Sequence, residues 1–380
     1  MKICHIITRM ILGGAQENTL LTCEGLYGRG HDVTLVTGPS LGPEGQLVTN
    51  AHGGGYRVIE VDQMRRPINP FRDHRAYRRL RKLLKELRPD VMHSHSSKAG
   101  ILARKAAARI GGMKIVHTVH GLPYHRYLSP WRNKLYIALE KRAARRSDAI
   151  ISVADAMTRQ ALAAGVGRRE QYTTIYSGME VEPYLVQADP GAFRESLGLD
   201  ADAVLVTQVS RLAELKGHQY ILDAAEKITD PRVRFCFVGD GRWRDRIEAE
   251  INRRGLADRF TLTGLIPPER IPAAMAASDI VVHCSLREGL ARALPQAMLA
   301  ARPVISFDID GAREVVNDST GVLLAPGDVA GLTTAIEKLI GDAELRASLG
   351  AAGREKCREM FSHNRMVDRI ENLYLQLLDS

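Results

Sequence analysis

The strongest constraint on the fold is a serial alternation of short apolar runs with longer helical patterns. The runs are rich in β-branched residues and show little polar alternation, which is typical of parallel strands buried on both faces. Helical patterns such as ENTLLTCEGLYGRG and RAYRRLRKLLKELRPD lie between them. This β-α-β order predicts an α/β protein with doubly wound parallel sheets. In the first half, strands are predicted at residues 2–7, 32–37, 56–61, 90–95, 114–120, 149–153 and 173–176.

The alternation begins again in the second half, and 380 residues are too many for one ordinary core. We therefore expect two Rossmann-like domains, over residues 1–182 and 183–362, with the boundary in YSGMEVEPYL. A C-terminal helix over 363–380 would pack back toward the N-terminal domain. In the second half, strands are predicted at residues 203–210, 233–241, 260–266, 280–285 and 303–308.

Charge is distributed unevenly along the chain. Residues 1–186 hold 29 Lys/Arg and 15 Asp/Glu, a net charge of +14, whereas residues 187–380 hold 24 and 29, a net charge of −5. The two halves therefore face different partners. Arginine richness from base composition is the alternative, but it explains the scarcity of acids in the first half less well.

The basic excess is greatest in residues 65–88, with ten Lys/Arg and two Asp/Glu, and Asn69-Pro70 is typical of a helix start. One interpretation is a surface helix that packs its leucines on the sheet, and the other is an arginine-rich face attracted to an anionic membrane surface. No nucleic-acid reading module accompanies the charge, so we expect no nucleic-acid partner. The apolar positions at helical spacing are Tyr77, Leu80, Leu84 and Leu87.

The cysteines and the apolar runs limit the cellular location. Cys4, Cys236 and Cys284 lie in apolar runs and no C-x-x-C pair occurs, so we expect buried free thiols rather than disulfides or a zinc site. The N-terminal apolar stretch is too short for a signal peptide, and no run is long enough to span a membrane. We expect a cytoplasmic location, with the inner face of the cell membrane as a candidate site of peripheral attachment.

Three motifs could bind a phosphorylated ligand, and the first is GGAQENTL. Gly13 and Gly14 would let the backbone approach a phosphate closely at the start of a helix. A Gly-Gly turn before a helix also occurs without any ligand. The motif is not G-x-G-x-x-G, which argues against a nicotinamide dehydrogenase.

The second motif is SRLAELKG, in which Arg211 and Lys216 share one strand-to-helix loop. Two such cations can neutralise a diphosphate without a metal ion. A solvated surface pair is the alternative.

The third motif is SLREGLARALPQAM, in which a polar loop ends a strand and opens a helix. Glu288 could accept hydrogen bonds from sugar hydroxyls, or it could simply be an acid in the first turn of a helix. Gln296 would face the same cleft one turn further on. The backbone N–H groups expected to point at an anion are those of Leu290, Ala291 and Arg292.

These motifs, together with VGDG, TGLIPPERIPAAMAASDI and RPVISFDIDGAREVV, resemble the retaining glycosyltransferases of family 4 over essentially the whole chain. The resemblance implies the GT-B fold, with two Rossmann-like domains facing across a cleft. It implies that Arg211 and Lys216 hold the donor diphosphate, with Gly14 approaching it. Glu288 would be the first acid of the family's E-x7-E motif, whereas its second acid, which binds the ribose, is replaced by Gln296.

The resemblance also assigns residues outside these motifs. His120 would lie near the donor sugar and the leaving group, although a histidine after an apolar strand is often structural. The backbone from Gly264 to Ile266 would read the base. His95 and Lys98 are candidate acceptor groups, and His93-x-His95 lacks a nearby carboxylate or cysteine to complete a metal site.

No metal or cofactor is expected. Asp308-Ile309-Asp310 has the form of a metal-binding D-x-D, but the resemblance places it in a turn after a core strand. Arg211, Lys216 and helix N-termini would already supply the positive charge that the diphosphate needs.

With these motifs, the resemblance implies a metal-independent, retaining hexosyltransferase that uses a nucleotide-diphosphate sugar, with UDP favoured over GDP. The expected acceptor is a hydroxyl of a lipid-linked or cell-surface saccharide. Three alternatives stay open: a soluble small-molecule acceptor, a nucleotide-sugar 2-epimerase of the same fold, and a donor-binding protein with little catalysis.

Overall fold

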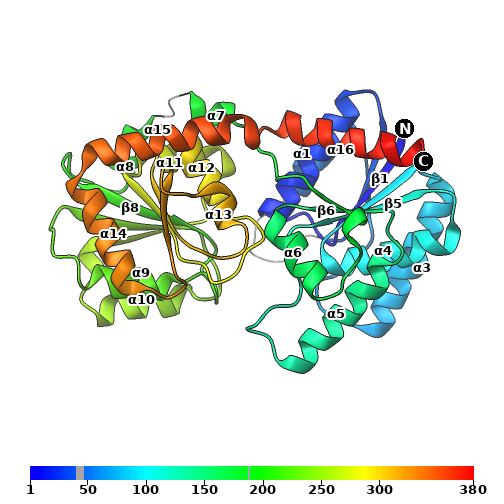
Figure 1. The fold of residues 1–380 in the computed structure, drawn as a ribbon, viewed down its shortest axis with the longest axis horizontal. Coiled ribbons are helices and arrows are strands. Elements are labelled where there is room, and N and C mark those ends of the chain that lie inside the picture. Colours follow the sequence, from blue (N-terminus) through cyan, green and yellow to red (C-terminus); the bar gives the residue numbers. More distant parts are fainter. Residues whose placement is uncertain (40–46, 187–188) are drawn as a thin grey trace. The chain divides into compact units, whose positions relative to one another are not determined.

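The computed structural model describes residues 1–39, 47–186 and 189–380. The chain divides into two compact units, the first formed by residues 1–179 and 362–380 and the second by residues 180–361. The sequence-based borders of 182 and 362 lie close to these. In each unit, helices cover both faces of a parallel sheet (Figure 1), which confirms the predicted α/β architecture.

The first unit contains a parallel sheet with the strand order β3-β2-β1-β4-β5-β6-β7. The order reverses between β1 and β4, which are neighbours although two strands separate them in the sequence. Ligands of open α/β sheets bind at such a switch point, outside the carboxyl ends of the strands. The strands are β1 (Lys2–Ile6), β2 (Asp32–Thr37), β3 (Arg57–Glu60), β4 (Val91–His95), β5 (Lys114–Val119), β6 (Ala149–Ser152) and β7 (Tyr172–Thr174).

Two layers of helices enclose this sheet. Helices α1 and α16 share the core on one face, where Val367, Ile370 and Tyr374 of α16 are buried, and α3 and α4 cover the other face. The last helix therefore belongs to the same unit as the first strand. The helices are α1 (Gly14–Gly28), α2 (Val48–Gly53), α3 (Pro70–Leu87), α4 (Ser97–Ile110), α5 (Pro130–Ala144), α6 (Asp155–Ala163), the 3-10 helix η1 (Arg169–Gln171) and α16 (His363–Leu378).

The basic helix α3 begins where its sequence predicts. Asn69 caps it by accepting a 3.0 Å hydrogen bond from the backbone N–H of Arg72, and Pro70 is its first residue. Leu80 and Leu84 are buried against α4. Its apolar face is therefore part of the protein core, as the packing interpretation predicts.

The second unit contains a parallel sheet with the strand order β10-β9-β8-β11-β12-β13, and its switch point lies between β8 and β11. Strand β13 was missing from the sequence-based assignment. It is a short edge strand with only its first residue buried, so its apolar signal is weak. The strands are β8 (Val204–Val209), β9 (Val233–Val238), β10 (Phe260–Gly264), β11 (Ile280–His283), β12 (Val304–Phe307) and β13 (Gly321–Leu324).

The helices of the second unit also form two layers. Helices α9, α10 and α14 pack on one face of the sheet, and α8 and α11 pack on the other. The helices are α7 (Glu182–Leu185), α8 (Pro190–Ser196), α9 (His218–Ala225), α10 (Arg244–Arg253), η2 (Ala257–Arg259), η3 (Pro268–Arg270), α11 (Ile271–Ala277), α12 (Ala293–Leu299), α13 (Ala312–Val315), α14 (Val329–Gly341) and α15 (Ala343–Met360).

Two smaller predictions can be compared with these elements. Cys4, Cys236 and Cys284 are buried free thiols, as their apolar surroundings predict, and so are Cys23 and Cys357. Among the described residues, no helix is both long and apolar enough to cross a bilayer.

Candidate active site

The carboxyl ends of β8 and β11 lead into two loops that are tied together at the switch point of the second unit. The backbone N–H of Leu286 donates a 2.8 Å hydrogen bond to the carbonyl of Leu215. The side chain of Gln208 donates to the carbonyl of Lys216 at 3.1 Å and accepts from the N–H of Cys284 at 3.3 Å. Each loop is therefore held in place by the other.

Two glycines allow this close packing of backbone. Gly217 has a φ of +75°, and a Cβ atom there would lie 1.9 Å from the carbonyl oxygen of Cys284. Gly239, in the VGDG motif, has a φ of +138°, and its Cβ would lie 2.1 Å from the carbonyl oxygen of Ser210. Only glycine fits both positions, because any side chain would push the loop that carries Lys216 away from the sheet.

The two loops bring Lys216 and Glu288 into contact. The Lys216 ammonium donates to Oε1 of Glu288, and Nε2 of His283 lies 3.4 Å from the same oxygen. The side chains of Lys216 and Glu288 are 19% and 20% exposed, so a ligand can reach them. The structure thus brings into contact two residues that were predicted from separate sequence motifs.

The turn after β12 positions the Glu288 backbone. The Glu288 N–H donates a 2.6 Å hydrogen bond to Oδ2 of Asp310, whose φ is +48°. The N–H of Gly311 donates to the carbonyl of Gly289 at 3.3 Å. Sequence reasoning gave Asp310 no role in the site, because nothing in the local pattern reveals a contact between two strand-end loops.

The charge state of Glu288 follows from its neighbours. Burial is the largest single influence and acts to raise the pKa of its carboxyl, but the charge and hydrogen bond of Lys216, together with His283 and the side chain of Ser285, hold that pKa below its ordinary value. Burial lowers the pKa of His283 to about 4, so this imidazole is neutral at pH 7. Glu288 is therefore an ionised hydrogen-bond acceptor, which suits contact with hydroxyl groups.

The helix of the third motif begins later than its sequence suggested. The expected helical N–H groups at 290–292 lie in the loop before α12, which begins at Ala293 with Arg292 as its N-cap residue. Leu290 and Ala291 thus belong to the loop that follows Glu288. Gln296 is half-buried within α12, and its N–H donates to the carbonyl of Arg292 at 3.1 Å.

The remaining predicted donor residues lie at or just beyond the carboxyl ends of β8 and β10, two strands of the same sheet that β9 separates. Arg211 is exposed on the loop that carries Lys216. Gly264 ends β10 with a φ of +70°, and its carbonyl accepts a 3.0 Å hydrogen bond from the N–H of Gly239. Ile266 packs against the core beside α8 and α11. Their roles toward a nucleotide stay predictions.

The two acids of the D-x-D motif have separate partners. Asp308 forms an ion pair with Arg313, whose Nε lies 2.8 Å from Oδ1, whereas Asp310 accepts from the Glu288 backbone. Asp310 therefore helps to order the loop of Glu288, whereas Asp308 pairs within its own turn.

In the first unit, helix α1 begins at Gly14, directly after Gly13. The carbonyl of Gly13 accepts hydrogen bonds from the N–H groups of Gln16 and Glu17, both at 3.0 Å. The glycine pair therefore opens a helix, as predicted, while contact with a phosphate stays a prediction.

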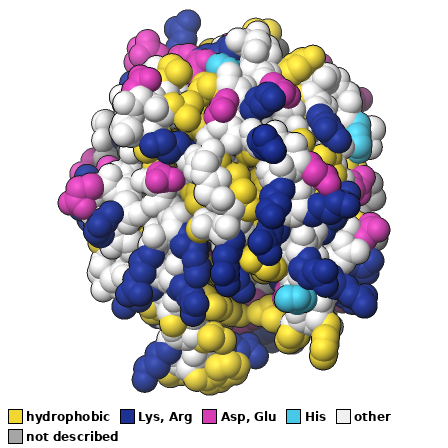
Figure 2. Space-filling view, turned by 90° about the vertical axis from the view of Figure 1, so that its right-hand side faces the viewer, with side chains coloured by type: hydrophobic (Ala, Val, Ile, Leu, Met, Phe, Trp, Pro, Cys, Tyr) yellow, Lys and Arg dark blue, Asp and Glu magenta, His cyan; other side chains and the backbone are white. Residues whose placement is uncertain are grey.

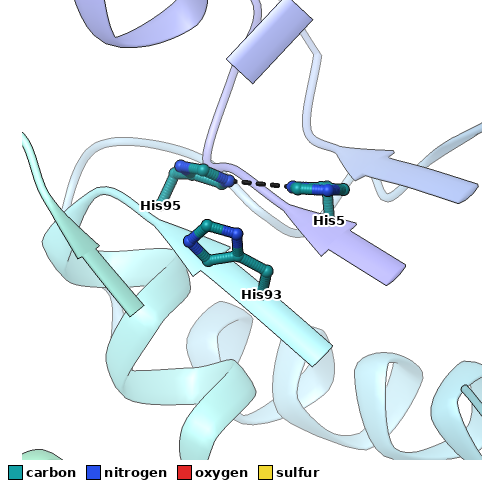
Figure 3. Close-up of side chains that lie close together, drawn as sticks. All are labelled: His5, His93 and His95. Carbon is teal, nitrogen blue, oxygen red and sulfur yellow. Dashed lines mark hydrogen bonds between the residues drawn. The ribbon is translucent and has the colours of Figure 1, made fainter. Parts of the chain in front are cut away.

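A cluster of histidines lies at the switch point of the first unit. His5 of β1 pairs in register with His93 of β4, and His95 follows on the same face (Figure 3). Nδ1 of His5 lies 3.0 Å from Nε2 of His95, and Nδ1 of His95 lies 3.1 Å from Nε2 of His120. Three imidazoles therefore form a continuous hydrogen-bonded chain that reaches His120, the residue that the resemblance places near the leaving group.

His93, the other histidine of this cluster, lies within hydrogen-bond distance of two hydroxyl groups. Nδ1 of His93 is 2.5 Å from the hydroxyl of Tyr374, and its Nε2 is 2.7 Å from that of Thr118. Each of His5, His93 and His95 is fully buried, and burial lowers all three pKa values, that of His5 to about 3. The cluster is therefore neutral at pH 7.

Sequence analysis found the His93-x-His95 pair but missed His5. One ring nitrogen from each of these three residues lies within 4.8 Å of the other two, which is the spacing of a possible metal site. Hydrogen bonds to neighbouring rings and hydroxyls occupy most of these nitrogens, so we interpret the cluster as a polar network of the core. Strand pairing was the missing signal, because only the register of β1 on β4 brings His5 to His93.

The two candidate acceptor groups have other contacts in this structure. His95 is buried between His5 and His120. The Lys98 ammonium lies 2.6 Å from Asp73 and also donates to the carbonyls of Arg65 and Pro67, at the start of the α3 region. Their contact with an acceptor stays a prediction.

Comparison with known proteins identifies the family. Residues 13–178 match the family described as "Glycosyl transferase 4-like domain", and residues 191–356 match "Glycosyl transferases group 1". The 2-deoxystreptamine glucosyltransferase of Streptomyces kanamyceticus is 32% identical over 69% of this chain and 70% of its own. An Escherichia coli UDP-Gal:alpha-D-GlcNAc-diphosphoundecaprenol alpha-1,3-galactosyltransferase is 28% identical over 100% of this chain and 97% of its own.

Solved structures give the same fold. HepE (Alr3699) of Anabaena, crystallised with UDP and glucose, is 23% identical, with a TM-score of 0.84 over 98% of this chain and 99% of that one. The predicted GT-B fold is thereby confirmed. The chain belongs to the GT-B glycosyltransferases that combine a glycosyl transferase 4-like domain with a group 1 glycosyl transferase domain.

Proposed function

We propose that this glycosyltransferase moves a hexose, with retention of anomeric configuration, from a UDP-sugar to a hydroxyl of a lipid-linked or cell-surface saccharide. The observation that carries the proposal is the contact of Lys216 with Glu288 at the switch point of the second unit. A cation suited to a diphosphate and a carboxylate suited to sugar hydroxyls are adjacent there, as a nucleotide-sugar donor requires.

The donor diphosphate would be held by Lys216 and Arg211 without a metal ion. Both side chains come from the loop after β8, which the contacts of Gln208 and the close approach at Gly217 hold in place. As the sugar–phosphate bond breaks, negative charge grows on the diphosphate, and positioned cations stabilise that charge.

Glu288 would orient the sugar rather than attack it. Its carboxylate is ionised and bound to Lys216, so it is a ready acceptor for sugar hydroxyls. The acceptor oxygen would form its bond to the anomeric carbon on the face from which the diphosphate departs. The bond between the anomeric carbon and the oxygen of the diphosphate breaks, and the acceptor's proton passes to that leaving oxygen. Positioning and charge stabilisation would then supply the catalysis.

A membrane-bound acceptor is supported by the charge of the first unit. Helix α3 buries its leucines, which leaves its arginine-rich side outward and suited to anionic headgroups. The E. coli relative is named for a diphosphoundecaprenol acceptor. We therefore propose peripheral attachment to the inner face of the cell membrane.

A soluble acceptor is the second candidate, because the relative that is 32% identical is named for 2-deoxystreptamine. The two candidates differ in one measurable respect. A lipid-linked acceptor should be glycosylated faster in anionic vesicles than in neutral detergent micelles, whereas a soluble aminocyclitol should show no such dependence.

The first experiment is a thermal-shift series with UDP, GDP and their sugars, since a ligand that binds the folded state raises the melting temperature by mass action. Transfer is then measured with labelled UDP-sugars in excess chelator, and the anomeric configuration of the product is read by NMR. Failure of every nucleotide to bind would overturn the proposal. An inverted product would overturn retention, loss of activity in chelator would overturn metal independence, and a 2-epimer formed without acceptor would identify an epimerase.

A further inference from the structure

Helix α5 turns its large apolar side chains toward solvent. Trp131, Leu135 and Leu139 recur every fourth residue and therefore form one stripe along the helix. Their exposed fractions are 64%, 46% and 37%. Three large apolar residues aligned on one helix face form a contiguous surface, unlike the isolated exposed residues that are common on proteins.

The opposite side of α5 fixes this orientation. Ala143 and Ala144 are buried, and Glu140 accepts a 2.8 Å hydrogen bond from Arg104 of α4, with both side chains almost fully buried. Turning Glu140 away from α4 would leave the Arg104 guanidinium buried without this carboxylate, which is strongly destabilising. The helix therefore cannot roll to hide its apolar stripe.

The charge around the stripe has one sign. Residues 121–147 contain seven Lys/Arg and a single acid, which is the buried Glu140. Arg132 and Lys134 are exposed and, at 100° per residue, lie on either side of the stripe. The Arg132 guanidinium lies 5.3 Å from the centre of the Trp131 ring. Figure 2 shows hydrophobic side chains gathered below a broad band of Lys and Arg on this side of the molecule.

We propose that α5 lies in the headgroup region of an anionic bilayer and inserts the Trp131–Leu135–Leu139 stripe among the lipid chains. The inference rests on the proposed membrane attachment and deepens it, because the arginine-rich face of α3 alone would give only salt-sensitive electrostatic attraction. Helix α5 is about 22 Å long, which suits a helix lying parallel to a membrane surface.

The start of α3 has a similar composition. Phe71 is 86% exposed and Ile68 is 72% exposed, and Arg66 and Arg72 are close to them in sequence. Lys98 anchors this segment through its contacts with Asp73 and two backbone carbonyls. The first unit therefore offers two rigid apolar surfaces surrounded by arginines.

Charge complementarity selects the lipid over a second copy of this chain. In a two-fold dimer built on α5, the same segment, with a net charge of +6, would face itself and be repelled. An anionic bilayer supplies both the apolar interior and the opposite charge.

The test uses the fluorescence of Trp131 to detect insertion of α5 into the bilayer. The chain has two tryptophans, so Trp243→Phe leaves Trp131 as the sole fluorophore. Vesicles of phosphatidylcholine and phosphatidylglycerol should shift its emission to shorter wavelength, and lipids brominated on their chains should quench it. In wild type, Leu135→Ser with Leu139→Ser should lower vesicle affinity at least tenfold and remove the binding that remains at high salt.

Leu375→Ser is the matched control, because Leu375 of α16 is 44% exposed in the same unit but lies outside α5. It should bind vesicles like wild type. Vesicle binding without a shift of Trp131 emission would overturn insertion. A dimer in solution that Leu135→Ser with Leu139→Ser dissociates would overturn the lipid as occupant. UDP binding measured on the same samples separates these results from a failure of the proposed transferase activity.

Discussion

Each unit has a cluster of polar side chains at its switch point, and the cluster is charged in the second unit but neutral in the first. In the second unit, Lys216 and Glu288 are charged, paired and partly exposed. In the first unit, His5, His93 and His95 are fully buried, and burial lowers their pKa values. The same sheet topology therefore supports an open ionic site suited to a charged ligand in one unit and a closed neutral network in the other.

The difference follows from the residues beside each cluster. In the second unit, glycines at 217 and 239 bring two loops together above the sheet, so that charged side chains meet where solvent still reaches them. In the first unit, the histidines lie within β1 and β4, and Tyr374 of α16 contacts His93 from the covering layer. We therefore expect changes in the first cluster to affect stability, and changes in the second to affect activity.

The largest expected effect is on activity in the second unit. Glu288→Gln should lower the rate of sugar transfer about tenfold to a hundredfold, since a hydrogen bond to a charged group contributes about 1.5–3 kcal/mol. The thermal stability should change little. Initial rates with a UDP-sugar, compared with melting temperatures, measure both.

Asp308→Asn is the control for Glu288→Gln. It removes a carboxylate that binds Arg313 in a nearby loop of the same unit. A variant at 288 with wild-type rates, or an equal loss in both variants, would remove Glu288 from the site.

The next prediction concerns the pH dependence of stability that the Lys216–Glu288 ion pair produces. Burial is the largest influence on the Glu288 carboxyl, so without Lys216 we expect its pKa to rise above the unfolded value, against the smaller opposing effects of His283 and Ser285. In wild type, the depressed pKa gives stability that is present above the unfolded pKa and lost as pH falls through the folded pKa. In Lys216→Met the sign reverses, so stability falls as pH rises through the raised pKa, by about 1–3 kcal/mol.

Unfolding free energies at several pH values measure this reversal against wild type. The double variant Lys216→Met with Glu288→Gln should lack the reversed dependence, because the unpaired carboxyl is gone. The ion-pair interpretation fails if the double variant keeps it.

Substitutions in the histidine cluster of the first unit should change the pH dependence of stability and leave the nucleotide affinity unchanged. Burial lowers the pKa of His5 to about 3, below the unfolded value of about 6.5. The unfolded state binds more protons between these values, so stability is lost as pH falls from about 6.5 toward 3. His5→Asn keeps an amide near the Nδ1 position but cannot titrate, and should reduce the slope by at most about 1.4 kcal/mol per pH unit.

Urea unfolding at closely spaced pH values gives that slope. His74→Asn, which removes an exposed histidine of the same unit, is the control. Equal slopes in wild type and His5→Asn would mean that His5 does not remain neutral in the folded state.

The same contrast explains what the sequence could predict. Buried parallel strands and α16 follow from local periodicity, and Lys216 and Glu288 lie in recognisable motifs. The roles of Gln208, Asp310 and His5 arise only when distant strands pair, which periodicity does not reveal. The apolar residues of α5 look like core residues in the sequence, and only the packing of Glu140 and its neighbours turns them outward.

The smallest expected effect is on the affinity for the ribose of UDP. Gln296 is half-buried in α12, eight residues after Glu288, where the resemblance expects a second acid. Gln296→Glu should bind UDP about two- to tenfold more tightly, because a carboxylate accepts stronger hydrogen bonds than an amide and can accept from both ribose hydroxyls. The gain is limited because a half-buried carboxylate loses hydration when the nucleotide covers it. Calorimetry with UDP and with 2′,3′-dideoxy-UDP isolates the contribution of the hydroxyls, since only UDP should gain. Equal gains for both nucleotides, or weaker UDP binding by a folded variant, would show that position 296 does not contact the ribose.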